Sequence, residues 1–116
     1  TTVGNDDKII FTDIKNNLIA LNPMEIRYIE AQNQYTEWHL RDGAQFIQRS
    51  TLSKYKGKLP DYFFQTHRSY IINLHAVSLV EKDQGGQVLI GETKLPIAYR
   101  RRRSFLRKLR EFALKG

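Results

Sequence analysis

The hydrophobic residues between positions 8 and 97 occur in runs of about four to seven residues, separated by polar and turn-forming residues. Runs of this length, bounded by Asn, Asp, Gly and Pro, are typical of β-strands joined by tight turns. The pattern predicts a mainly β fold of about ten short strands in antiparallel sheets. The predicted strands comprise residues 8–13, 18–21, 25–31, 35–40, 45–49, 63–66, 70–72, 76–81, 87–90 and 94–97.

Two segments depart from the strand pattern and predict helices. Ser50 or Thr51 is suited to cap one short helix that extends through Lys58 and ends before Pro60. Near the end of the chain the apolar residues recur with the period of an α-helix, so a C-terminal helix that begins near Tyr99 is predicted to dock on the sheet. The docking residues are Phe105, Leu106, Leu109, Phe112 and Ala113.

Alternation within the strands predicts which residues form the core. In the strand at 35–40, Thr36, Trp38 and Leu40 share one face, while Tyr35, Glu37 and His39 share the other. We therefore expect His39 to make a surface contact across strands. The predicted core residues lie in the most apolar strands: Ile26, Ile29, Trp38, Phe64, Tyr70 and Ile72.

Length and composition predict one folded domain. The 116 residues suffice for a single core, and no apolar run approaches the roughly 18 residues that cross a bilayer. We expect residues 1–7 to be a frayed terminus or linker and 8–116 to be the domain. The chain starts at Thr1 without Met, which suggests a piece of a longer protein. The absence of cysteine excludes disulfides and thiolate chemistry and fits a reducing compartment.

The net charge of +7 is confined to the C-terminal segment. Residues 1–98 carry eleven cations and eleven acidic residues, whereas residues 99–116 carry eight cations and only Glu111. The run 100–103 consists of four arginines at the predicted helix start, where the helix dipole favours negative charge. An anionic ligand at that end would account for the arginines, and a polyanion is the indicated partner. A solvated basic tail remains the alternative.

The sequence contains no recognisable catalytic or cofactor motif. Its three histidines, His39, His67 and His75, have no spacing typical of a metal site. Nucleophile elbows, dinucleotide-binding loops and phosphate-binding loops are missing. We therefore expect no enzyme activity, no metal and no cofactor.

Two polar corners interrupt the apolar strands. Residues 66–69 (Thr-His-Arg-Ser) separate two strands, and residues 32–34 (Gln-Asn-Gln) separate two others. Arginine reads guanine and amide side chains read adenine in the major groove of DNA. The same residue types also satisfy the backbone of ordinary turns, so both interpretations stay open at this point.

Several stretches together resemble the LytTR-type DNA-binding domain of bacterial response regulators. The resemblance is colinear from about Ile26 to Leu109. Residues 26–31 read Ile-Arg-Tyr-Ile-Glu-Ala, 64–74 read Phe-Gln-Thr-His-Arg-Ser-Tyr-Ile-Ile-Asn-Leu, and 95–101 read Leu-Pro-Ile-Ala-Tyr-Arg-Arg. The loop at 32–36 (Gln-Asn-Gln-Tyr-Thr) and the stretch at 39–43 (His-Leu-Arg-Asp-Gly) add to the match.

The resemblance implies an elongated antiparallel β fold without a recognition helix, whose loops enter successive major grooves of bent double-stranded DNA. It further implies a cytoplasmic transcription regulator in a two-component phosphorelay, and a homodimer formed on tandem promoter half-sites through an upstream receiver domain. Arg102 joins the candidate contacts because of the charge excess. The candidate DNA-binding residues are Asn33, Gln34, Tyr35, Thr36, His67, Arg68, Ser69, Gln87, Arg100, Arg101 and Arg102.

Two other function classes fit parts of the pattern. A binder of RNA or single-stranded nucleic acid would use exposed aromatic residues such as Tyr35 and Trp38 to stack on bases. A membrane or protein interaction module would use the basic amphipathic C-terminal helix alone. Neither alternative requires the polar corners to read duplex DNA.

Overall fold

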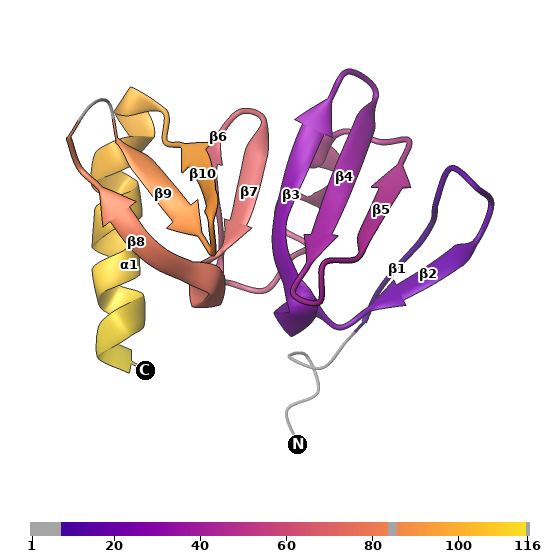
Figure 1. Cartoon of the computed structure of the whole chain (residues 1–116), viewed down its shortest axis with the longest axis horizontal. Helices are drawn as coiled ribbons and strands as arrows, with labels where there is room; N and C mark the ends of the chain where they lie inside the picture. The colour runs from indigo at the N-terminus through magenta and orange to yellow at the C-terminus, as the bar shows by residue number, and fades with distance from the viewer. Residues whose placement is uncertain (1–7, 84–85, 116) are drawn as a thin grey trace.

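Three antiparallel sheets stand side by side, and one helix lies at the end of the row (Figure 1). The structure is a computed structural model that describes residues 8–83 and 86–115. The predicted linker at 1–7, the apex of the turn at 84–85 and the side chain of Ala113 lie outside the described residues. Along its principal axes the molecule measures 42 × 38 × 25 Å.

The strands occur where the hydrophobic pattern predicted them, with no end shifted by more than one residue. They are β1 (Ile9–Thr12), β2 (Leu18–Leu21), β3 (Ile26–Gln32), β4 (Tyr35–Leu40), β5 (Gln45–Gln48), β6 (Phe63–His67), β7 (Tyr70–Asn73), β8 (Val77–Glu81), β9 (Gln87–Ile90) and β10 (Thr93–Pro96). Among the described residues the strand order is β1-β2, β5-β4-β3-β7-β6 and β10-β9-β8. The predicted mainly β fold is confirmed.

Short 3-10 turns account for the shifted starts of β3 and β8. Asn22 accepts a hydrogen bond from the Met24 N–H and starts η2 (Pro23–Glu25), so β3 begins at Ile26. Asn73 caps η4 (Leu74–Ala76) in the same way, through the His75 N–H. Strand β8 consequently begins one residue later than predicted.

The predicted helix from Ser50 or Thr51 through Lys58 is wrong. The segment forms only the 3-10 turn η3 (Leu52–Tyr55). The Thr51 hydroxyl bonds to the Ser53 hydroxyl at 3.0 Å instead of capping the backbone. Gly57 then takes a φ of 80°, which ends helical geometry.

The C-terminal helix forms as predicted. Its α-helical part, α1 (Arg102–Lys115), follows directly on the 3-10 turn η5 (Tyr99–Arg101). Phe105 is fully buried against Phe64 of β6, with ring centroids 5.5 Å apart. Leu106, Leu109 and Phe112 are half-buried against the same core.

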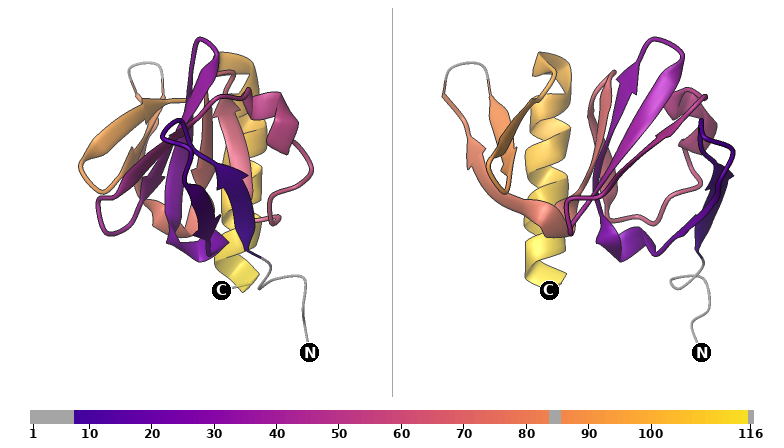
Figure 2. Two further views of the ribbon diagram at one scale, coloured as in Figure 1. Left: turned by 90° about the vertical axis from the view of Figure 1, so that its right-hand side faces the viewer. Right: turned by 45° about the vertical axis from the view of Figure 1, so that its right-hand side comes forward.

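Two hydrophobic cores lie on opposite sides of β3 and β7. Ile29 and Ile71 pack with Trp38, β1, β2 and η3 in the first core, while Tyr28 and Ile72 pack with β8–β10 and α1 in the second. Successive side chains of a strand point to opposite faces, so one strand can serve both cores. Figure 2 shows the two halves from the side.

The predicted core is confirmed for four residues. Ile26, Ile29, Trp38 and Ile72 have no exposed surface, and Trp38 packs edge-on against Tyr55. The exceptions, Phe64 and Tyr70, are half-buried because they line the rim of the second core.

Truncation of Phe105 tests whether α1 is held on the second core by this side chain. Phe105→Ala removes a fully buried ring and should lower the free energy of unfolding by about 3–5 kcal/mol. Leu79→Ala, at an apolar residue of β8 that is 52% exposed, should change it by less than about 0.5 kcal/mol. Urea denaturation measures both. Equal losses in the two variants would show that α1 does not anchor the second core.

Candidate nucleic-acid interface

Three segments that are distant in sequence meet along one edge of the molecule. They are the β3–β4 turn (33–34), the β6–β7 corner (67–69) and the start of the C-terminal helix (99–102). All lie at the top of Figure 1 and at the same height in both views of Figure 2, which are turned about the vertical axis. We call these three segments the loop edge.

Hydrogen bonds between backbones join the three segments. The Ala31 N–H, at the end of β3, donates to the Ser69 carbonyl at 2.8 Å. The Ala98 N–H, just before η5, donates to the Thr66 carbonyl at 2.8 Å. The loop edge is therefore one connected surface with the β6–β7 corner at its centre.

The β3–β4 turn projects two amide side chains into solvent. Gln32 pairs with Tyr35, so Asn33 and Gln34 alone form the turn. Asn33 takes a φ of 57°, a left-handed conformation that Asn tolerates better than most residues. Asn33 and Gln34 are exposed and Tyr35 is 38% exposed, so all three can contact a ligand.

Arg49 adds a cation to this turn that the predicted site did not include. Its Nη2 donates to Gln34 Oε1 at 3.4 Å, and its side chain is exposed. In the sequence, Arg49 merely ends a predicted strand far from the arginine run. Only the register of β4 with β5 brings it beside Gln34.

Thr36 is a correction to the predicted contact set. Its side chain is fully buried, and its hydroxyl accepts a hydrogen bond from Trp38 Nε1 at 3.0 Å. The same hydroxyl lies 3.2 Å from the Ser50 hydroxyl. Thr36 therefore supports the hairpin from inside and is not available to a ligand.

The β6–β7 corner presents Arg68 to solvent and holds its two neighbours in place. Arg68 is exposed, whereas His67 and Ser69 are half-buried. His67 Nδ1 accepts the Ser69 N–H at 3.1 Å, which leaves Nε2 as the proton-bearing nitrogen of the neutral ring. Gln65 Nε2 donates to the Arg68 carbonyl at 3.4 Å. These bonds fix the backbone from which Arg68 projects.

The arginines at the helix start differ in their surroundings. Arg100 is exposed. Arg101 donates through Nη1 to the Gln65 carbonyl at 3.2 Å, so part of its guanidinium group stabilises the corner. Arg102 is half-buried, with its guanidinium carbon 5.2 Å from the centroid of the Tyr99 ring.

The Arg102 side chain packs against Gly86. A Cβ atom at Gly86 would lie 2.7 Å from Arg102 Nε, and the glycine has a φ of 80°. The positive φ favours glycine here, and the missing side chain leaves the space that the Arg102 guanidinium group occupies. Gln87 follows as the first residue of β9, half-buried at the loop end of that strand.

The loop edge concentrates positive charge and hydrogen-bond donors. Its three segments contain four arginines and no acidic residue. The first turn of α1 also lacks an acidic residue, so the positive end of the helix dipole adds to the arginine charge. Such a surface favours phosphate oxygens and the acceptor atoms of bases.

Comparisons with known proteins agree with this geometry. The LytTr DNA-binding domain family matches residues 16–110. An uncharacterized response regulatory protein of Vibrio cholerae is 33% identical over 87 residues, which cover 70% of this chain and 33% of that protein. The chain therefore spans about one third of the length of this relative.

A solved structure shares the fold. The LytTr DNA-binding domain of a methyl-accepting/DNA response regulator from Bacillus cereus superimposes with a TM-score of 0.72. The match covers 89% of this chain and 95% of the other, at 20% identity. Within the described residues, no helix has the length and apolar character needed to cross a membrane.

The buried role of Thr36 leads to a stability prediction. Thr36→Val leaves the Trp38 indole N–H without its acceptor and should lower the free energy of unfolding by about 1–3 kcal/mol. Thr12→Val, at an exposed threonine of β1, should change it by less than about 0.5 kcal/mol. Thermal or urea denaturation distinguishes them. If Thr36→Val did not change the free energy of unfolding, Thr36 would again be a candidate DNA contact.

Proposed function

The chain belongs to the LytTr DNA-binding domain family, and from this premise we propose that the loop edge binds duplex DNA as the output domain of a bacterial response regulator. The observation that carries the proposal is that backbone hydrogen bonds join the three segments into one edge. This edge is rich in arginine and contains no acidic residue. In this proposal the two β-turns enter the major groove, and the start of the C-terminal helix lies on the phosphate backbone.

The side chains divide into readers of bases and contacts to phosphate. Arg68 projects from a corner whose backbone is fixed, which suits bidentate contact with guanine. The exposed Arg100 has the freedom to follow the phosphates. The remaining proposed contacts, with Thr36 removed, are Asn33, Gln34, Tyr35, His67, Ser69, Gln87, Arg101 and Arg102.

The proposal includes the setting of the domain. The Vibrio relative is named as a response regulatory protein and is about three times as long as the matched part. We accordingly propose residues 8–116 as a non-enzymatic cytoplasmic module that acts with a receiver domain and dimerises on tandem half-sites. Phosphoryl transfer to the receiver would then regulate binding of this module to promoters.

The structure weakens both alternative functions. Trp38 is fully buried, so the predicted stacking of bases on Trp38 is wrong, and of the two residues only Tyr35 is exposed. The apolar face of α1 packs in the second core through Phe105 and is not free to lie in a membrane. Neither a single-stranded nucleic-acid binder nor a membrane-bound helix is favoured.

Substitution of Arg68 tests the division between base readers and phosphate contacts. A cognate site is first selected from random duplexes, and binding is then measured by fluorescence anisotropy at several salt concentrations. Arg68→Ala should weaken cognate binding by about 1–3 kcal/mol and random binding much less. The specificity ratio should therefore fall.

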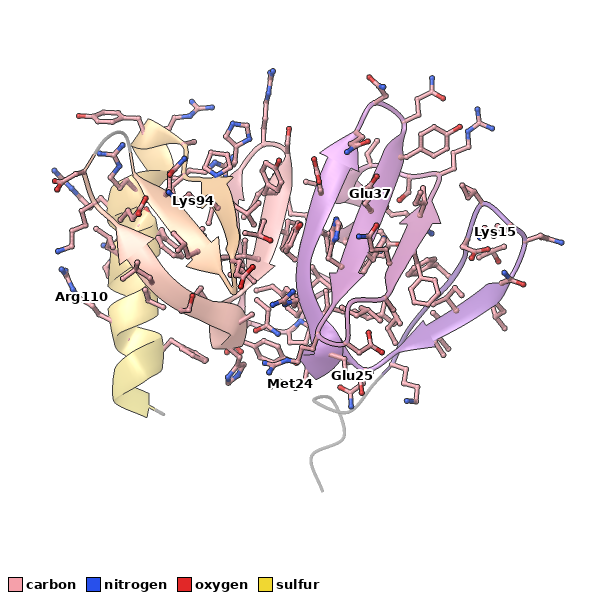
Figure 3. The ribbon with its side chains drawn as sticks, viewed as in Figure 1. Lys15, Met24, Glu25, Glu37, Lys94 and Arg110 are labelled. Atoms are coloured by element: carbon pink, nitrogen blue, oxygen red, sulfur yellow. The ribbon has the colours of Figure 1, made fainter. Side chains whose placement is uncertain are left out.

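Two variants serve as controls. Arg100→Ala should weaken binding to the cognate and the random duplex about equally. It should also reduce the slope of log affinity against log salt concentration by roughly one unit, because it removes one phosphate contact. Arg110 lies on α1 far from the loop edge (Figure 3), so Arg110→Ala should have the smallest effect on binding to either duplex. Equal losses on both DNAs for Arg68→Ala would make Arg68 a phosphate anchor. No effect would place the corner outside the groove.

A further inference from the structure

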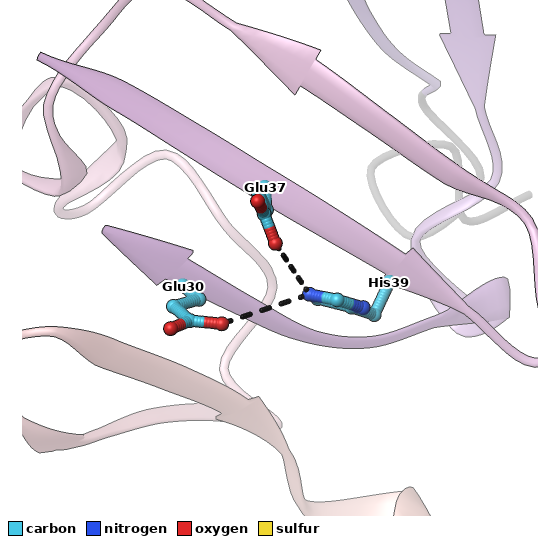
Figure 4. A group of neighbouring side chains, drawn as sticks. All are labelled: Glu30, Glu37 and His39. Carbon is cyan, nitrogen blue, oxygen red and sulfur yellow. Dashed lines mark ion pairs between the residues drawn. The ribbon is translucent and has the colours of Figure 1, made fainter. Parts of the chain in front are cut away.

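Two glutamates and a histidine converge on one face of the β3–β4 hairpin. Glu30 of β3 pairs directly with Glu37 of β4, and His39 lies two residues further along β4 on the same face. His39 Nε2 lies 3.3 Å from Glu37 Oε1 and 3.8 Å from Glu30 Oε1 (Figure 4). One ligand atom from each residue falls within 4.8 Å of the other two.

This arrangement has an electrostatic cost without a cation. Like charges directly opposite each other on paired strands are destabilising. Among the described residues, the ion pairs of Glu30 and Glu37 involve His39 alone. The Arg27 guanidinium is near enough to influence His39 electrostatically but forms no ion pair with either carboxylate among those described. A cation between the two carboxylates would remove the repulsion.

The three side chains are held in place by their neighbours. The His39 ring stacks on Tyr28, with centroids 4.2 Å apart and planes inclined by 14°. Glu30 Oε2 accepts hydrogen bonds from Gln32 Nε2 at 3.2 Å and from the Tyr70 hydroxyl at 3.3 Å. Glu30 Oε1 is thereby left facing His39. Such outer hydrogen bonds are typical of metal ligands.

The His39 ring is buried beside the two carboxylates. Its side chain is 13% exposed, and Nε2 is inaccessible to solvent, with the Glu37 and Glu30 carboxylates 3.3 and 3.8 Å away. Burial lowers the pKa of His39, although the Glu37 and Glu30 carboxylates act in the opposite direction. A neutral imidazole offers a lone pair, which is the form that binds metals.

We propose that Glu30 Oε1, Glu37 Oε1 and His39 Nε2 bind one divalent transition-metal ion of the Zn²⁺ class. In a tetrahedral site with bonds of about 2.0–2.1 Å, neighbouring ligand atoms lie roughly 3.4 Å apart. The observed 3.3 and 3.8 Å are close to that spacing. One imidazole and two carboxylates suit Zn²⁺ better than Ca²⁺ or Mg²⁺, which take oxygen ligands, and they leave a position for water.

The proposed site lies two residue pairs below the β3–β4 turn. Between them stand the pairs Ala31–Thr36 and Gln32–Tyr35. A metal bridging Glu30 to β4 would cross-link the base of the hairpin that presents Asn33 and Gln34. The site is independent of DNA binding by the loop edge, and each can fail without the other.

Metal titration of the whole chain tests the proposal. Isothermal titration with zinc chloride should show one equivalent bound, and Co²⁺ should give the visible absorption of a tetrahedral site. His39→Gln and Glu37→Gln should each weaken Zn²⁺ binding by at least about 100-fold, and Tyr70→Phe by about 10-fold. His75→Gln, at an exposed histidine of η4, should bind like the unchanged chain.

Two results would overturn the proposal. One is a folded chain that binds no Zn²⁺ at neutral pH. The other is His39→Gln protein that retains Zn²⁺ binding. Circular dichroism of each variant confirms that it is folded, so that loss of binding reports on the ligands.

Discussion

The antiparallel pairing of β3 with β7 is the interaction on which the rest of the structure depends. The hairpins β3–β4 and β6–β7 are local, but residues 28–30 meet residues 70–72 across about forty positions of sequence. This pairing separates the two hydrophobic cores, since Ile29 and Ile71 face one side and Tyr28 and Ile72 face the other. It also sets the β3–β4 turn beside the β6–β7 corner, where the Ala31 N–H meets the Ser69 carbonyl.

The position of the arginines at the start of the C-terminal helix explains their presence there. An arginine run at a helix start is electrostatically unfavourable, because it lies at the positive end of the helix dipole. The Ala98–Thr66 and Arg101–Gln65 hydrogen bonds place that run beside the β6–β7 corner. A surface that costs local stability is therefore assembled where three segments converge, as expected for a site that binds a polyanion.

Features governed by local sequence were predictable, whereas those governed by register were not. The strand alternation placed Trp38 inside, and the helical period placed Phe105 against the sheet. The failed helix at 50–58 shows the limit of local signals, because the Thr51 hydroxyl bonded to Ser53 instead of the backbone. Thr36 matched a family contact position, although the strand alternation put it on the same face as Trp38, and its bond with Trp38 shows that it is buried.

The same limit applies to the missed residues. Arg49 reaches Gln34 only through the pairing of β4 with β5. His39 was predicted to make a surface contact across strands, and it does stack on Tyr28, but its side chain is only 13% exposed. Glu37 shares its strand face, but the meeting of His39 with Glu30 depends on the register of β3 with β4, which spacing between histidines could not show.

The central claim is that three separate segments form one DNA-binding edge, and amide NMR during titration with duplex DNA tests it most directly. Shifts should concentrate at residues 33–34, 67–69 and 99–102. Signals of η2 and η4, which lie at the opposite edge in Figure 1, should stay in place. Shifts centred on η2 and η4, or confined to one of the three segments, would contradict the account.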